Sequence, residues 1–234
     1  MKKIKFRNNI ILNNFSNHLE LFTNLKSSMV KYINKGTCIL PGGKSPLHLY
    51  KLLSLSKRIK NNRRVFLSDD RLVNNDNDLS NFKMILNNLK IDVNPRFLFS
   101  YYDLINNYGL IKAQKYISQN FLNNEIECSL LGIGEDAHTA SLFPDNNQIL
   151  DNQKIGIIIK NKSENFKRFS LSFDTLLSSK KIIFLATGKR KNQILKSIFS
   201  EKYDPLKYPV QKIFNNHPDV TIYCDEDAFK NILG

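Results

Sequence analysis

The chain has 234 residues, of which 41% are hydrophobic, and this supports a single core of domain size. Its formal net charge is +14, but lysine and arginine are dispersed along the chain and not gathered in one helix or tail. The densest basic run, SKRIKNNRR at 56–64, lacks the interleaved aromatic residues on which bases stack, so we expect no nucleic-acid partner. No apolar run approaches the ~20 residues that cross a bilayer, and the N-terminal segment lacks the apolar region of a signal peptide. We therefore expect no membrane association.

The three cysteines, Cys38, Cys128 and Cys224, are far apart, and each lies in an apolar run. An odd number without CxxC spacing argues against a disulfide framework and against a zinc site. Buried thiols in a reducing cytoplasm are the expectation.

Apolar runs alternate along the chain with segments whose apolar residues recur at helical spacing. In chain order, we predict strands at 37–40, 64–68, 96–100, 128–134, 154–160, 168–173, 181–187 and 220–225. Helices are predicted at 47–57, 79–89, 105–124, 189–199 and 226–233, and a loop at 69–78. Short β-branched strands that alternate with helices favour βαβ units. The sequence therefore predicts one α/β domain over residues 1–234, with a mostly parallel sheet.

Polar clusters follow four of the predicted strands, and in open α/β sheets ligands bind beyond the carboxyl ends of the strands. The four clusters are Gly42 to Ser45, Asp69 to Arg71, Asp136 with His138, and Gly188 with Lys191. We predict that they converge on one crevice, although loops after strands are polar in any case.

The first cluster, LPGGKSP, places two glycines between a strand and a helix. Gly42 and Gly43 can adopt backbone angles that point successive N–H groups into one concavity. Ser45 is placed to cap the helix that begins near Pro46, and such a helix N-terminus binds phosphate. An ordinary strand–helix turn is the alternative. The loop matches neither GxGxxG nor a Walker loop, so we predict no nucleotide cofactor.

Three cations are placed to bind an anion. Arg71 offers a planar fork that suits a phosphate or carboxylate, unless it pairs with Asp69 or Asp70. Lys191 belongs to a run of cations at a predicted helix N-terminus, and such a run is unfavourable unless an anion offsets its charge. The alternative is that this run forms a solvated basic turn. Arg168 heads a strand, where a surface arginine is the alternative. The predicted substrate- and phosphate-binding residues are Gly42, Gly43, Lys44, Ser45, Asp69, Arg71, Arg168 and Lys191.

The segment LLGIGEDAHTASLFPD, residues 130–145, carries the candidate catalytic residues. An imidazole titrates near neutrality, so His138 can take a proton from water. Asp136 lies two residues earlier, and a neighbouring carboxylate can fix the tautomer of the ring. A loop histidine of purely structural role and a serine nucleophile with His138 as its base are the alternatives. The GxSxG segment of α/β-hydrolases is absent.

These segments resemble those of the bacterial 6-phosphogluconolactonases. LLGIGEDAHTASLFPD is similar to that family's LGxGxDGHTASLFPG, and its HTASLFP stretch is highly specific. DDRLV, with Ser80 and Asn81 further on, is similar to DER-x-V…SN, and LPGGKSP resembles a GG-S/T-P phosphate loop. RFSLSF, TGKRK and PVQKIF…VTIYCDEDA follow in the family's order. The resemblance covers about residues 36–228, nearly the whole chain.

The resemblance implies an open Rossmann-like sheet with helices on both faces, as in glucosamine-6-phosphate deaminase. It also implies hydrolysis of 6-phospho-D-glucono-1,5-lactone in the oxidative pentose phosphate pathway, with no metal or cofactor. His138 then matches the general base, and Arg71 and Lys191 match the phosphate contacts. Three departures stand out, because Ala137 and Asp145 replace usual glycines and Asp70 replaces a usual glutamate. Ala137 is strained if its position needs a positive φ.

A δ-lactone is an activated ester, so a positioned phosphate, one base and oxyanion stabilisation suffice for its hydrolysis. We therefore expect a small sugar-phosphate substrate, a cytoplasmic location and a monomer or weak dimer. The alternatives are glucosamine-6-phosphate deaminase, in which IAFNEP follows the histidine, and a non-catalytic sugar-phosphate-binding protein. A basic nucleic-acid-binding module is a third.

Overall fold

The structure is a computed structural model, and it describes residues 1–56, 64–89, 98–121, 125–150, 155–161, 164–230 and 232. Its centre is a seven-stranded sheet with the strand order β1-β2-β10-β9-β6-β3-β4. The strands are β1 (Lys2–Arg7), β2 (Ile10–Phe15), β3 (Thr37–Leu40), β4 (Val65–Leu67), β6 (Ile126–Gly132), β9 (Ile182–Ala186) and β10 (Val220–Asp225). The edge strand β1 pairs antiparallel with β2, and the remaining pairs are parallel. The predicted mostly parallel sheet is confirmed.

Three of the central strands are buried on both faces. Every residue of β3, β9 and β10 is buried, and their sequences are mostly apolar, with Thr37, Thr221 and Asp225 as the polar exceptions. Such runs are typical of parallel strands that helices cover on both sides. The segments 37–40 and 220–225 are strands with the predicted bounds.

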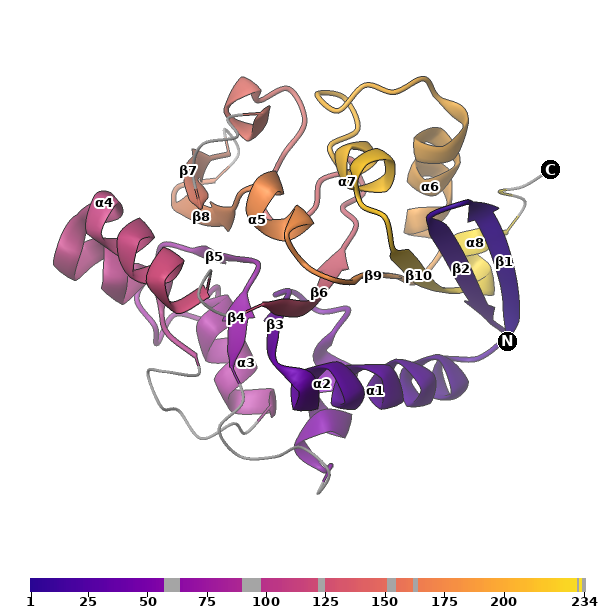
Figure 1. Cartoon of the computed structure of the whole chain (residues 1–234), viewed down its shortest axis with the longest axis horizontal. Helices are drawn as coiled ribbons and strands as arrows, with labels where there is room; N and C mark the ends of the chain where they lie inside the picture. The colour runs from indigo at the N-terminus through magenta and orange to yellow at the C-terminus, as the bar shows by residue number, and fades with distance from the viewer. Residues whose placement is uncertain are drawn as a thin grey trace.

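Helices cover both faces of this sheet, as the resemblance implied. Figure 1 shows α1 and α2 on one side, with α5, α6 and α7 on the other. The helices are α1 (His18–Lys35), α2 (Leu47–Ser54), α3 (Asn81–Leu89), α4 (Tyr101–Phe121), α5 (Phe173–Leu177), α6 (Arg190–Ser200), α7 (Val210–Asn216) and α8 (Glu226–Phe229). A 3-10 helix spans Asn147–Leu150. No helix within these described ranges is both long enough and apolar enough to cross a bilayer.

A second sheet, which the sequence did not predict, stands beside the first. It has three antiparallel strands in the order β5-β8-β7, namely β5 (Asp69–Arg71), β7 (Gly156–Lys160) and β8 (Lys167–Leu171). The loop predicted at 69–78 is therefore wrong over its first three residues. Their sequence, DDR, has no strand propensity, and the pairing with β8 imposes the extended conformation.

Several other predicted elements differ from the structure in kind or in bounds. Residues 98–100, the described part of the strand predicted at 96–100, are buried but lie in no strand, because Phe99 packs instead against the rings of Phe66, Tyr101 and Tyr116. Helix α4 begins at residue 101 and is interrupted at Gly109, where φ is 76°. The terminal helix ends at Phe229, since the next residue leaves helical angles. Residues 96–97 and 122–124 lie outside the described residues.

The direction of the chain changes between β3 and β6. From β3 it moves outward through α2 to β4, and from β6 it moves the other way to β9 and β10. Strands β3 and β6 are neighbours, so loops that leave their carboxyl ends diverge and open a crevice between them. The fold thus brings residues 41–46 and 133–145 to one place.

Candidate active site

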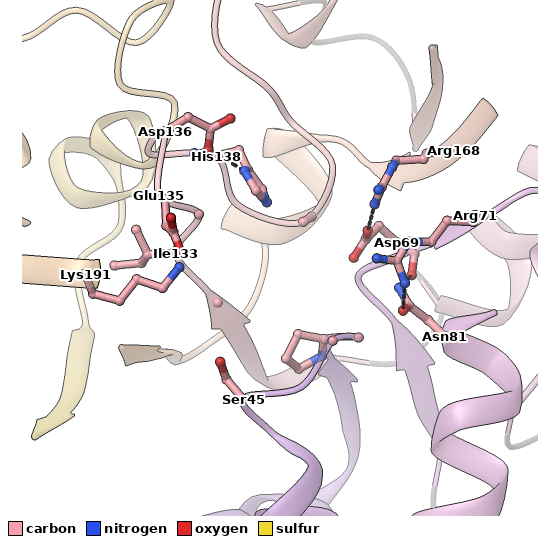
Figure 2. A pocket seen from close by; sticks show the side chains of 16 residues that line it. Ser45, Asp69, Arg71, Asn81, Ile133, Glu135, Asp136, His138, Arg168 and Lys191 are labelled. Carbon is pink, nitrogen blue, oxygen red and sulfur yellow. Dashed lines mark hydrogen bonds and ion pairs between the residues drawn. The ribbon is translucent and has the colours of Figure 1, made fainter. Parts of the chain in front are cut away.

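A cavity of about 650 Å³ lies at this point of the sheet, and Figure 2 shows its walls. Of the predicted site residues, those that line it are Gly42, Gly43, Ser45, Asp69, Arg71, Asp136, His138, Arg168 and Lys191. Lys44 is exposed and does not belong to the lining. The four polar clusters therefore do converge on one crevice, as their positions after strands predicted.

The glycine loop is shaped by two different constraints. Gly43 has a φ of 86°, which glycine adopts readily. Gly42 does not need a positive φ, but a Cβ there would lie 2.0 Å from the side-chain Cγ of Asn81. The predicted cap at Ser45 is wrong: the helix N-cap is Pro46, and it has no side-chain capping bond. The chain enters α2 through a turn in which Leu47 N–H donates to Lys44 O at 3.3 Å, so the hydroxyl at 45 falls too early to cap.

His138 and Asp136 form the predicted pair. Nδ1 of His138 lies 2.5 Å from Oδ1 of Asp136, and the same oxygen accepts from the His138 backbone N–H at 3.2 Å. Gly134 makes room for this pair, because a Cβ at that position would lie 2.0 Å from Nδ1. With Nδ1 held by the carboxylate, Nε2 is the nitrogen that can accept a proton from a molecule in the cavity.

Asp136 stays ionised near neutral pH. Burial raises its pKa, but the hydrogen bond and charge of His138 outweigh this, and the net pKa is lowered. An ionised carboxylate accepts the Nδ1–H of His138 and stabilises the imidazolium that forms when Nε2 takes a proton. The ring of His138 also packs on Phe143, with centroids 4.7 Å apart.

The segment around His138 contains three non-glycine residues with positive φ. These are Ala137 (68°), Ala140 (51°) and Asp145 (56°). The condition for strain at position 137 is therefore met, since Ala137 has a positive φ where a glycine is usual, and Asp145 occupies the second usual glycine position. Backbone hydrogen bonds hold the turn, since Gly134 N–H donates to His138 O at 2.7 Å and Val210 N–H to Ala137 O at 3.2 Å. Left-handed angles cost an alanine about 1–2 kcal/mol, which such bonds offset.

Arg71 and Arg168 are direct partners in the β5–β8 register. The side chain of Arg71 donates from Nη1 to Asn81 Oδ1 at 2.6 Å and to Leu79 O at 3.0 Å, and both of these acceptors are neutral oxygens. Burial, and then repulsion from Arg168, lowers the pKa of Arg71, although nearby carboxylates oppose this. Among the residues that the structure describes, no carboxylate makes a direct contact with the guanidinium of Arg71.

Arg168 is buried, so the alternative of a surface arginine is wrong. Its Nε donates to Glu164 Oε2 at 2.7 Å, and its Nη2 donates to Oε1 of the same carboxylate. The guanidinium also lies 5.5 Å from the ring centroids of both Phe143 and Phe166. Both arginines line the cavity. The charge of Arg168 is paired with Glu164, whereas the guanidinium of Arg71 has no carboxylate partner among the described residues.

Lys191 faces the cavity from the other side. In Figure 2 it lies on the wall formed by Ile133 and Glu135, and Arg71 lies on the opposite wall. Burial lowers the pKa of Lys191, against the opposing carboxylates Glu135 and Asp136. The two cations therefore do not form one cradle but approach the cavity from two sides.

Asp70, which replaces a usual glutamate, does not line the cavity. Its carboxylate accepts from the backbone N–H groups of Arg71, Asn81 and Phe82 at 2.8, 2.6 and 3.1 Å. It joins β5 to the first turn of α3. Its role is therefore to organise the wall that carries Arg71.

Sequence reasoning missed three polar residues of the site, Asn81, Glu135 and Glu164. Asn81 and Glu135 lie within segments that carry the resemblance, but no pattern assigned them a role. Glu164 reaches Arg168 from a loop four residues earlier, and nothing in its local sequence indicates this contact. No cluster of three or more potential metal ligands occurs among the residues that the structure describes.

Comparisons with known proteins agree with this geometry. Residues 18–222 match the family described as glucosamine-6-phosphate isomerases/6-phosphogluconolactonase, and the chain belongs to this family. A 6-phosphogluconolactonase of Aggregatibacter actinomycetemcomitans is 28% identical over 199 residues, 82% of this chain and 85% of that protein.

Two solved structures show that the fold is shared by both kinds of enzyme in the family. A 6-phosphogluconolactonase from Shewanella baltica has a TM-score of 0.81 at 20% identity, covering 94% of this chain and 99% of that one. A monomeric glucosamine-6-phosphate deaminase has a TM-score of 0.77 at 18% identity, covering 93% and 98%. The fold alone therefore does not separate lactone hydrolysis from deamination.

Proposed function

We propose that this protein hydrolyses 6-phospho-D-glucono-1,5-lactone to 6-phospho-D-gluconate, a step of the oxidative pentose phosphate pathway. The observation that carries the proposal is the His138–Asp136 pair, held at 2.5 Å in a cavity that two cations enter from opposite walls. The curated relative from Aggregatibacter, which is a 6-phosphogluconolactonase, supports it.

In the proposed reaction, Arg71 and the glycine loop hold the phosphate and Lys191 supplies a cation from the other wall. Nε2 of His138 removes a proton from a water molecule as its oxygen attacks the lactone carbonyl carbon. The tetrahedral intermediate then collapses, the ring C–O bond breaks, and the imidazolium returns its proton to the departing ring oxygen. Asp136 stabilises the imidazolium throughout. General base catalysis of this kind supplies about 10²–10⁴-fold in rate.

Glucosamine-6-phosphate deamination is the second candidate, because one of the structural neighbours has that activity. The sequence after His138 favours the lactonase, since TASLFP stands where the deaminases have IAFNEP. A non-catalytic sugar-phosphate-binding protein would have no use for a base paired to a carboxylate at the mouth of the cavity.

We propose the cytoplasm as the site of the reaction. Cys38, Cys128 and Cys224 are free and buried, and burial raises the pKa of the thiols of Cys38 and Cys224 to about 12. Free thiols of this kind suit a reducing compartment. The oligomeric state, a monomer or weak dimer, stays a prediction.

The test compares both substrates with the purified protein and with His138→Ala. We expect lactone hydrolysis well above the spontaneous rate and no release of ammonia from glucosamine 6-phosphate. His138→Ala should lose at least about 10²-fold in kcat. Wild-type hydrolysis no faster than the spontaneous reaction, or an unimpaired His138→Ala protein, would refute the proposal.

A further inference from the structure

Asn81, the first residue of α3, lies in the cavity wall with its side chain buried. Its Nδ2 donates to the backbone carbonyl of Asp69 at 3.0 Å, and its Oδ1 accepts from Nη1 of Arg71 at 2.6 Å. The amide thus connects the backbone of β5 to the guanidinium on the same strand. Figure 2 shows this contact on the Arg71 wall.

The amide of Asn81 is held in one place from several directions. Its backbone N–H donates to the carboxylate of Asp70 at 2.6 Å, which fixes the start of the helix. Its side chain lies directly over Gly42, where a Cβ would come within 2.0 Å of both Cγ and Oδ1. Both polar atoms of this buried amide are hydrogen-bonded, and the backbone of Gly42 packs against one face of it. Another rotamer would break these bonds, so the amide has no other rotamer of comparable energy.

The orientation of Arg71 depends on this amide. Nη1 donates to Asn81 Oδ1 and, at the longer distance of 3.0 Å, to Leu79 O. Nε is buried and has no hydrogen-bond partner among the described residues, so it does not help to orient the group. The two bonds of Nη1 are therefore the hydrogen bonds that orient the guanidinium of Arg71 among the described residues.

We propose that Asn81 is a positioning residue that sets the guanidinium of Arg71 for the phosphate of the substrate. The inference rests on the proposed function, in which Arg71 contacts that phosphate. An amide suits this role because it is neutral: it accepts a hydrogen bond from Arg71 without cancelling the charge that attracts the anion. A carboxylate in its place would compete with the phosphate for the same cation. Preorganised cations bind more tightly because no side-chain freedom is lost on binding.

The experiment measures KM and kcat for Asn81→Ala, Arg71→Ala and the double variant with two substrates. The substrates are 6-phospho-D-glucono-1,5-lactone and D-glucono-1,5-lactone, which lacks the phosphate. Asn87→Ala is the matched control, because Asn87 is exposed on the same helix. We expect Asn81→Ala to raise KM for the phosphorylated lactone on the order of tenfold, with kcat nearly unchanged. The unphosphorylated lactone and the Asn87→Ala protein should show no such change.

The double variant shows whether Asn81 acts through Arg71. If it does, adding Asn81→Ala to Arg71→Ala changes KM by less than about twofold, because the effects of coupled residues do not add. An unchanged KM in Asn81→Ala, or a full further loss in the double variant, overturns the inference.

Two further measurements keep the inference testable. If Asn81→Ala does not fold, Asn81→Asp takes its place, because it preserves the shape of the side chain. Its carboxylate should raise KM for the phosphorylated lactone and leave KM for the unphosphorylated lactone unchanged. An unchanged KM for the phosphorylated lactone overturns the inference. If the wild-type protein has no lactonase activity, the proposed function fails separately. Calorimetric binding of 6-phospho-D-gluconate to the wild type and to Asn81→Ala then tests the positioning role by itself.

Discussion

The position of His138, the proposed base, depends on two neighbours of very different kinds. Asp136 accepts its Nδ1–H, and Gly134 leaves the space in which the ring lies. Adding a methyl group at 134 would bring it within 2.0 Å of Nδ1 and force the pair apart. The spacing G-x-D-x-H is thus a packing requirement as well as a chemical one.

Asp136→Asn should separate orientation from charge. An asparagine at 136 can keep a hydrogen bond to Nδ1 but favours the wrong tautomer and cannot stabilise the imidazolium. We expect kcat to fall by about 10²–10⁴-fold, the contribution of a positioned general base, with KM for the phosphorylated lactone nearly unchanged. Steady-state kinetics measure this, and a kcat equal to that of the wild type would show that the carboxylate has no catalytic role.

At the residue scale, the sequence predicts the His138–Asp136 pair and much of the cavity lining, because those residues follow strands directly. It does not predict how the cations are used. Arg168 is neutralised by Glu164, and Arg71 is oriented by Asn81. Both contacts depend on where β5 and β8 place their side chains, and the three-residue strand β5 has no signature of its own. The sequence therefore predicts which residues line the cavity better than it predicts which side chains bind to one another.

At the element scale, the buried carboxylate of Asp70 connects β5 to the start of α3. Asp70 accepts three backbone N–H groups there, from Arg71, Asn81 and Phe82. Burial nevertheless raises the pKa of Asp70 to about 7, against the lowering effect of these hydrogen bonds. The connection between β5 and α3, which includes Arg71, is thus sensitive to pH.

The sign of this effect follows from the direction of the shift. Because the pKa of Asp70 in the folded chain lies above its ordinary value of about 3.9, the folded state holds the proton more tightly. The contribution of Asp70 to the free energy of unfolding is therefore complete below pH ~4. It decreases as the pH rises to about 7, and the total decrease is a few kcal/mol at most. Denaturant unfolding of Asp70→Asn should lack this fall. Equal pH slopes for the two proteins between pH 4 and pH 7 would contradict the expectation.

The parallel elements were predictable because burial on both faces requires unbroken apolar runs such as IIFLA in β9. The antiparallel sheet was not recognised as separate, since KRFSL and GIIIK look like further strands of the same kind. Only the pairing order distinguishes the two sheets, and pairing is a property of distant residues.

For the molecule as a whole, the active cavity lies where the main sheet changes direction and meets the second sheet. The main sheet contributes the glycine loop and the His138 segment, and the second contributes Arg71 and Arg168. A ligand that contacts both should therefore stabilise the complete fold.

We expect 6-phospho-D-gluconate to raise the thermal midpoint of the wild-type protein. Binding to the folded state alone adds about 2.7 kcal/mol when the ligand is at 100 times its Kd. D-gluconate, which lacks the phosphate, should have little effect at the same concentration. Thermal unfolding followed by circular dichroism tests this, and equal shifts with the two ligands would show that the phosphate is not recognised.

The pairing of Arg168 with Glu164 has a practical consequence for anyone who handles this protein. Because Glu164 offsets the charge of Arg168, a small oxyanion in the cavity is attracted chiefly to the guanidinium of Arg71. Under the proposed function, sulfate or inorganic phosphate in a storage buffer competes with the sugar phosphate for this guanidinium and lowers the apparent activity. Zwitterionic buffers with chloride as the counter-ion are the appropriate medium for its kinetics.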